Sequence, residues 1–166
     1  MKFPKKPTNS SCLRGTGPDA FPFPISHLPF PSSVFSYHRR VQFAETDLAG
    51  QVHFSWMFRY MEEAEHALWR SLGLTIAERG SELGWPRIAA SMDFRSPLHF
   101  EDEIEVRLQV AAVKTRTIEY VCSIHCGDRV AASGRMSSIC VRRMDGHFKA
   151  SEIPAPVAAR LNNLVR

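Results

Sequence analysis

Two kinds of spacing divide the chain into strands and one long helix. Apolar residues recur at helical spacing through residues 54–72, where Ser55 is the expected N-cap and Gly73 follows the last turn. At 1.5 Å per residue, this helix is about 28 Å long. Apolar and polar residues alternate instead in three other segments, which predicts strands at 35–46, 102–113 and 116–126. Two more strands are predicted at 87–95 and 129–143.

Turn residues separate these segments. Gly127-Asp128 and Asp145-Gly146 predict tight hairpin turns, and short helices are expected at 75–82 and 155–165. The order is thus a strand, a long helix and then several strands joined by hairpins. This order predicts an α+β fold in which one curved antiparallel β-sheet wraps around one long central helix.

The composition fits one globular domain with an N-terminal extension. Apolar residues make up 44% of the 166 and charged residues 23%, an ordinary balance for a packed core. The chain has no run of eighteen apolar residues, so we expect no membrane-spanning helix. Seven of the 11 prolines lie within residues 1–31, and proline removes backbone donors and fixes φ. We therefore expect residues 1–34 to be a disordered, Pro-rich arm and residues 35–166 to be the folded domain.

The net charge of +4 raises the question of nucleic-acid binding. Residues 1–35 hold four basic residues and one acidic residue, whereas the remaining residues hold 17 basic and 16 acidic residues. The positive charge therefore belongs mainly to the arm, and the folded body is nearly neutral. We expect no nucleic-acid partner.

The four cysteines favour a reducing compartment. Cys122 and Cys126 lie on one face of a predicted strand, about 13 Å apart at the usual rise per residue, which is too far for a disulfide. A zinc site would need a second pair of ligands with suitable spacing. We interpret all four, Cys12 and Cys140 included, as small buried hydrophobic residues and expect a cytoplasmic protein.

The candidate chemistry lies between the first strand and the long helix. Asp47 follows the strand in a loop that contains Gly50, seven residues before Phe54 opens the helix. A helix N-terminus offers unpaired N–H groups and the positive end of a dipole, which stabilise a developing oxyanion. The carboxylate of Asp47 can act on a carbonyl placed there, as a nucleophile or as the base of a water. An Asp before a helix is also a common cap or turn residue.

The pattern around Asp47 carries a family resemblance. The spacing D-x-x-G-x-V-x-F from Asp47 to Phe54, followed by a helix carrying Glu-Glu-Ala, resembles the 4-hydroxybenzoyl-CoA thioesterase family of hotdog-fold proteins. It is also similar to the Tol–Pal-associated acyl-CoA thioesterases within that family. The segments 93–98 and 101–106 resemble the family's aromatic-x-x-Pro and following strand, so the resemblance covers about residues 36–154.

The resemblance implies a single hotdog fold and particular site residues. Asp47 matches the catalytic carboxylate, and Gly50 matches the loop glycine that lets the backbone approach the thioester. Phe54 matches the residue whose backbone N–H polarises the thioester carbonyl. The implied substrate is an acyl-CoA, and the implied assembly is a homodimer or homotetramer with active sites between subunits.

Three departures from the family pattern fall in the first turn of the helix. Phe54, Trp56 and Met57 stand where the family commonly has His or Tyr, Asn, and Tyr. This more apolar turn favours a hydrophobic or aromatic acyl group, or else it marks reduced activity.

Several other residues are candidates for supporting roles. His53 is a candidate auxiliary group beside Asp47, or else a loop histidine without a chemical role. Another branch of the fold uses a helix carboxylate, for which Glu62 is the candidate, whereas Glu63 is expected to be solvated. Thr117 corresponds to a Ser or Thr near the family's pocket, or else is an ordinary strand residue.

Coenzyme A brings anionic phosphates, so basic residues are expected at the mouth of the pocket. Lys114 and Arg116, at a predicted hairpin tip, are the first candidates. No P-loop, G-x-G-x-x-G, nucleophile-elbow or H-E-x-x-H pattern is present, and we expect no metal and no cofactor.

Two other functions compete with thioester hydrolysis. A hydratase or dehydratase acting on enoyl or hydroxyacyl thioesters would need a His paired with a carboxylate, and His53 would have to supply it. A non-catalytic acyl-CoA-binding module would be consistent with the altered helix start at Phe54, Trp56 and Met57.

Overall fold

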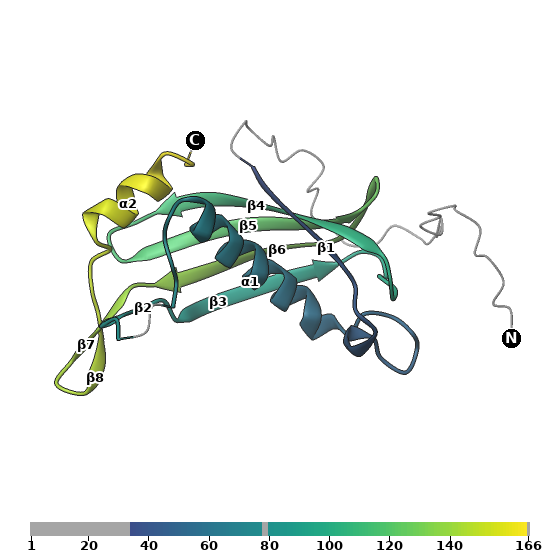
Figure 1. Cartoon of the computed structure of the whole chain (residues 1–166), viewed down its shortest axis with the longest axis horizontal. Coiled ribbons are helices and arrows are strands. Elements are labelled where there is room, and N and C mark those ends of the chain that lie inside the picture. The colour runs from purple at the N-terminus through teal and green to yellow at the C-terminus, as the bar shows by residue number, and fades with distance from the viewer. Residues whose placement is uncertain (1–33, 78–79, 166) are drawn as a thin grey trace, which may run out of the picture.

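The computed structural model describes residues 34–77 and 80–165. It contains a five-stranded antiparallel sheet and a smaller three-stranded antiparallel sheet (Figure 1). The large sheet has the strand order β1 (Phe35–Arg40), β4 (Glu103–Val113), β5 (Thr117–Cys126), β6 (Arg129–Ile139) and β3 (Arg87–Phe94). The small sheet has the order β2 (Leu83–Gly84), β7 (Val141–Met144) and β8 (His147–Ala150).

The helices lie against the large sheet. The long helix α1 (Phe54–Ser71) runs across one face of it, and the short helix α2 (Ala155–Asn162) lies near the end of β4 (Figure 1). A single 3-10 turn, η1 (Phe43–Glu45), follows β1. The structure therefore has the predicted α+β class, with antiparallel strands throughout the large sheet.

The core forms between α1 and the inner face of the large sheet. The helix buries one stripe, Met57, Tyr60, Met61, Ala64 and Leu68, which is the predicted apolar face. In β4 every second residue is buried, from Ile104 to Val110, as the alternation predicts. Burying side chains of this size contributes about 1.5–3 kcal/mol each.

The predicted N-cap of α1 is wrong by two residues. His53 caps the helix: its Nδ1 lies 3.5 Å from the Ser55 N–H and 2.8 Å from the Ser55 hydroxyl. The loop before the helix brings His53 into the extended conformation that an N-cap requires, with φ −61° and ψ 135°. Ser55 is thus the second residue of the helix.

The predicted first strand, 35–46, is shorter in the structure. Its ladder with β4 ends at Arg40, which pairs with Glu103. Because β4 begins at Glu103, residues after Arg40 have no partner strand in the large sheet, and the chain turns into η1. The turn places Glu45 in the core, with only 4% of its surface exposed.

The predicted strand 129–143 is two strands that belong to different sheets. β6 ends at Ile139, opposite Thr117, which is the first residue of β5. Beyond that point the Cys140 N–H bonds the Arg116 carbonyl at 2.7 Å, and β7 pairs with β8 instead. The strand β8, whose four residues are all exposed, was not predicted from the sequence. The turn at Asp145 and Gly146 is confirmed, with φ values of 52° and 80°.

The predicted helix at 75–82 is wrong for the residues that the structure describes there. Residues 75–77 and 80–82 are not helical, and Gly80 has φ 81°, which is outside the helical region. The predicted arm, 1–34, falls almost entirely outside the described residues and stays a prediction.

The cysteines match their interpretation only in part. Cys122 and Cys140 are buried free thiols, and burial raises the pKa of Cys122 to about 12. Cys126 is buried but is not one of the free thiols, and Cys12 lies outside the described residues. The cysteines therefore give no argument about the compartment, and a cytoplasmic location stays a prediction. No helix within 34–77 or 80–165 is long and apolar enough to cross a bilayer.

Candidate active site

Asp47 lies in a tight turn between η1 and α1. Its N–H donates to the Gln51 carbonyl at 2.7 Å, and its carbonyl accepts from the Gly50 N–H at 2.9 Å. Its Oδ1 accepts from the N–H groups of Ala49 at 2.8 Å and Gln51 at 3.2 Å. The carboxylate is exposed, and its Oδ2 has no hydrogen-bond donor among the described residues. One oxygen thus holds the turn while the other remains available to a substrate or a water.

Gly50 provides a bend that other residues rarely adopt. Its φ is 73°, in the left-handed region. A Cβ built there would meet no heavy atom within 4 Å. The glycine therefore serves the backbone conformation of the turn and leaves open space beside Asp47.

The start of α1 carries the Phe54 N–H, which the family resemblance predicts to be the donor to the thioester carbonyl. The Trp56 N–H bonds the His53 carbonyl at 2.9 Å, and the Ser55 N–H faces His53 Nδ1. The Phe54 N–H, one residue before Ser55, has no acceptor in the part of the chain that the structure describes. Together with the positive end of the helix dipole, this N–H is suited to a carbonyl oxygen or an oxyanion.

Three phenylalanine rings line the surface next to this N–H. The Phe94 ring, on β3, lies edge-on to the rings of Phe54 and Phe58, with centroid distances of 6.3 and 6.4 Å. Phe54 is 58% exposed and Phe94 is 51% exposed. These side chains form an aromatic wall that still has surface to offer a ligand. We refer to Phe54, Phe58 and Phe94 as the aromatic wall.

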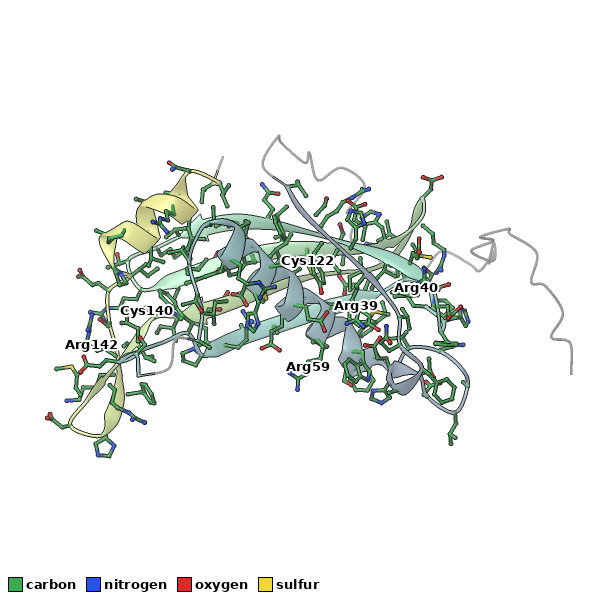
Figure 2. The ribbon with its side chains drawn as sticks, in the orientation of Figure 1. Arg39, Arg40, Arg59, Cys122, Cys140 and Arg142 are labelled. Carbon is green, nitrogen blue, oxygen red and sulfur yellow. The ribbon has the colours of Figure 1, made fainter. Side chains whose placement is uncertain are left out.

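Glu45, two residues before Asp47, belongs to a partly buried ionic cluster whose other members are Arg39, Tyr60 and Glu63. Arg39 comes from β1 and points toward α1 (Figure 2), where its Nη1 bonds both oxygens of Glu63, at 2.8 and 2.7 Å. Its Nη2 bonds the Glu45 carboxylate. The Tyr60 hydroxyl donates to Glu45 at 2.6 Å. Burial and this bond raise the pKa of Tyr60 far above its usual range, so the hydroxyl is a neutral donor.

The helix carboxylates differ from their predictions. Glu63 is not simply solvated, because it holds Arg39 and also accepts from the Tyr37 hydroxyl at 3.3 Å. Glu62 is half-buried and pairs with Arg59 of its own helix at 3.1 Å. Glu62 lies eight residues after Phe54, about 12 Å farther along the helix at 1.5 Å per residue.

The remaining predicted residues lie far from Asp47 within one chain. Thr117, Lys114 and Arg116 are at the turn that joins β4 to β5, whereas Asp47 is near the start of β4, where Gln51 pairs with His99. The 11 residues of β4 separate these ends, about 33 Å at 3.3 Å per residue. Lys114 forms an ion pair with Glu119. One chain alone therefore brings together Asp47, Gly50, His53 and Phe54, but not the other three.

Sequence reasoning missed the ionic cluster and the contact of Phe94 with α1. The four members of the cluster come from β1, η1 and α1, and each looks like an ordinary polar or amphipathic residue in its own segment. Phe94 entered the sequence analysis only as the aromatic residue of the segment 93–98, and β3 does not alternate between buried and exposed residues. Only the packing of α1 against β1 and β3 shows which of these residues meet, because no spacing within one segment records it.

Comparison with known proteins gives the family. Residues 41–161 match the model of the thioesterase-like superfamily. A 1,4-dihydroxy-2-naphthoyl-CoA hydrolase of Thermosynechococcus vestitus is 28% identical over 137 residues, covering 80% of this chain and 92% of the relative. The corresponding hydrolase of Prochlorococcus marinus is 28% identical over 126 residues, covering 70% and 83%.

Solved structures agree in fold. A gentisyl-coenzyme A thioesterase matches with a TM-score of 0.67 and 28% identity, covering 74% of this chain and 98% of that one. A 1,4-dihydroxy-2-naphthoyl-CoA thioesterase from Synechocystis matches with a TM-score of 0.73 and 24% identity, covering 79% and 97%. The second likeness speaks for the fold alone. The match over residues 41–161, well over half of the chain, shows that the chain belongs to the thioesterase-like superfamily.

Proposed function

We propose that this protein hydrolyses an acyl-CoA thioester to the free acid and CoA, with Asp47 as base or nucleophile and the start of α1 as the oxyanion site. One observation carries the proposal. An exposed carboxylate, held in a turn through Oδ1 only, stands seven residues from a helix N–H that has no acceptor among the described residues. Relatives named as CoA thioester hydrolases support the same chemistry.

The reaction needs both groups at one carbonyl. The thioester oxygen would accept from the Phe54 N–H, which makes the carbonyl carbon more electrophilic and stabilises the oxyanion. Asp47 would then attack this carbon and release the CoA thiolate, leaving an acyl anhydride that water hydrolyses. Alternatively, Asp47 would take a proton from a water that attacks the carbon directly. Both routes consume one water and give the acid and the CoA thiol.

The aromatic wall favours an aromatic acyl group. A carbonyl bound to the Phe54 N–H would direct its acyl substituent along the rings of Phe54, Phe58 and Phe94. Rings arranged edge-on to one another accept a further ring at similar distances. The named substrates of the relatives, naphthoyl and gentisyl thioesters, are consistent with this choice. We also propose, from the Asp47 motif, that the protein belongs to the 4-hydroxybenzoyl-CoA thioesterase family.

A working site would need a second subunit. β3 is an edge strand of the large sheet, and six of its eight residues are exposed. Two chains joined through β3 by a twofold axis would form one continuous sheet, with each hotdog wrapping its own α1. Antiparallel pairing would bring the end of one sheet that carries Asp47 toward the opposite end of its partner, where Thr117, Lys114 and Arg116 lie. A homodimer, or a homotetramer built from it, would thus complete the pocket for CoA.

A non-catalytic acyl-CoA-binding module is the second candidate. Its support is that Oδ1 of Asp47 accepts from two backbone N–H groups, as an ordinary turn residue does. The hydratase alternative has weaker support, because His53 Nδ1 faces the Ser55 hydroxyl and N–H and so serves the helix cap.

A panel of acyl-CoAs with a thiol reagent separates the three. We expect free CoA to appear with aromatic acyl groups and not without enzyme. Binding of acyl-CoA by calorimetry without release of thiol would identify the binding module. Formation of a hydrated or dehydrated thioester by mass spectrometry, again without free thiol, would identify the hydratase.

A further inference from the structure

We infer that Glu45 is a positioning residue, which sets the place of the Asp47 carboxylate relative to the Phe54 N–H; the inference rests on the proposed function. Glu45 does not face the substrate side of the turn. It is 4% exposed, and its role would be exerted through the backbone that carries the two reacting groups.

The side chain of Glu45 is fixed from three directions. Arg39 bonds one carboxylate oxygen, and the Tyr60 hydroxyl bonds the other at 2.6 Å. The Gln42 N–H also donates to that second oxygen, at 2.8 Å. These donors belong to β1, to α1 and to the residue before η1. The carboxylate therefore joins η1 to β1 and to α1, which Arg39 and Glu63 also connect to each other.

A backbone hydrogen bond of Glu45 joins the two ends of the loop that carries Asp47. Its carbonyl accepts from the His53 N–H at 2.9 Å, and the next residue, Thr46, pairs with Val52. His53 directly precedes Phe54, and Asp47 directly follows Thr46. A shift of Glu45 would therefore move both reacting groups, on the two sides of the loop, relative to each other.

Arg39 links Glu45 to α1 through an ion pair with Glu63 and a contact with the Tyr60 ring. Its guanidinium lies 4.4 Å above the Tyr60 ring and is shared by two carboxylates, those of Glu45 and Glu63. Without the Glu45 charge, Arg39 would still be held by Glu63, and β1 would keep its place on the helix. In Glu45→Gln an amide nitrogen, which cannot accept, replaces one carboxylate oxygen. η1 would then lose either its bond to Arg39 or its bonds to Tyr60 and Gln42, and these bonds locate the loop.

Two buried tyrosine hydroxyls give a matched pair of variants. Tyr60 is fully buried and donates to Glu45, and Tyr120 is 1% exposed and accepts from the Trp69 indole N–H at 2.9 Å. Tyr60→Phe and Tyr120→Phe each remove one buried oxygen from the core, but Tyr120 lies on β5 beside the last turn of α1. We expect Tyr60→Phe to lower kcat about tenfold with little change in KM, and Tyr120→Phe to leave both near wild type.

A double-mutant cycle tests whether Glu45 acts through Asp47. We expect Glu45→Gln to lower kcat about ten- to hundredfold, at temperatures well below that of unfolding. In the Asp47→Asn background the same change should have almost no further effect, because the group that it positions is gone. Equal effects of Glu45→Gln in both backgrounds, or equal kcat losses in Tyr60→Phe and Tyr120→Phe, would overturn the positioning role.

Amide hydrogen exchange gives a readout that does not depend on hydrolysis. We expect Glu45→Gln and Tyr60→Phe to speed exchange in residues 46–54 about tenfold or more, with β4 and β5 unchanged and Tyr120→Phe without effect on this loop. If the wild-type protein hydrolyses no thioester while this loop still responds, the proposed function fails and the positioning by Glu45 stands. If exchange in the loop is the same in all three variants, Glu45 does not position it, whatever the activity.

Discussion

Glu65 of α1 and Arg87 of β3 form a two-pronged ion pair in which the carboxylate is buried. Nη1 of Arg87 lies 3.1 Å from one carboxylate oxygen of Glu65, and Nη2 lies 2.5 Å from the other. The Ser138 hydroxyl also accepts from Nη1, at 2.8 Å. The Glu65 side chain is 3% exposed. This pair fastens the edge strand β3, the proposed subunit contact, to the central helix.

Removing one member of this pair should lower the free energy of unfolding by several kcal/mol. We expect Glu65→Ala to lower the free energy of unfolding by about 3–5 kcal/mol, because it leaves the charge of Arg87 without its buried partner. Urea unfolding measures the change. The matched control is Glu103→Ala, which breaks an ion pair with Arg40 (labelled in Figure 2). The Glu103 side chain is 76% exposed and that of Arg40 55%. That loss should stay below about 1 kcal/mol. Equal losses in the two variants would contradict the structural role of Glu65.

Gly134 should not accept a side chain. A Cβ at this position would lie 2.5 Å from the Ser91 carbonyl oxygen of β3 and 3.2 Å from the end of the Met92 side chain. Because the first of these atoms is backbone, β3 itself would have to move. We expect Gly134→Ala to lower the free energy of unfolding by about 1–3 kcal/mol, measured in urea. Ser133→Ala is the control: its buried hydroxyl has no partner among the described residues, so its removal should be nearly neutral.

The aromatic wall should lower KM for aromatic acyl-CoAs relative to short aliphatic ones. We expect Phe94→Ala to raise KM about tenfold for aromatic acyl-CoAs and to change KM little for short aliphatic ones, because it removes the ring between Phe54 and Phe58. Phe148→Ala is the control, since Phe148 is 57% exposed but lies on β8. A uniform rise in KM over both substrate classes would show that Phe94 does not contact the acyl group.

Glu105 should make stability depend on pH in the acid range. Hydrogen bonds from Arg107 and Ser36, at 2.8 and 2.6 Å, hold the pKa of this carboxyl at about 2, below its ordinary 4.5. A depressed pKa adds stability above the unfolded value, and this stability is lost as pH falls toward the folded one. The difference in unfolding free energy between wild type and Glu105→Gln should therefore be constant above about pH 4.5 and shrink toward pH 2. A difference that is flat over this range would contradict the assignment.

The sequence predicted those features that one segment determines by itself. The alternation in β4 and the apolar stripe of α1 follow from local spacing, and so does the placement of Asp47 seven residues before the helix. The end of β6 at Ile139 could not be predicted, because it depends on where its partner β5 begins. The burial of Glu45 could not be predicted for a similar reason. The alternation of residues 35–46 suggests that Glu45 lies in a strand, and only the packing of β1, η1 and α1 together shows that it is buried.

The predicted phosphate ligands lie far from Asp47 within one chain. The charge of Lys114 and Arg116 at a hairpin tip predicts a role in CoA binding, and the structure places that tip at the other end of β4 from Asp47. A sequence contains no direct record of the partner subunit. Their role in binding CoA therefore depends on an assembly through β3, which sedimentation of the purified protein would measure.

The most direct measurement of the central claim is the rate of thiol release from a preferred acyl-CoA by wild type and Asp47→Asn. Asparagine keeps the size of Asp47 and an oxygen that can accept from Ala49 and Gln51, so the turn should persist. We expect the variant to unfold at the same urea concentration, to bind the acyl-CoA, and to release thiol at least about a thousandfold more slowly. Thiol release at the wild-type rate by a folded Asp47→Asn protein would contradict the claim that Asp47 carries the reaction.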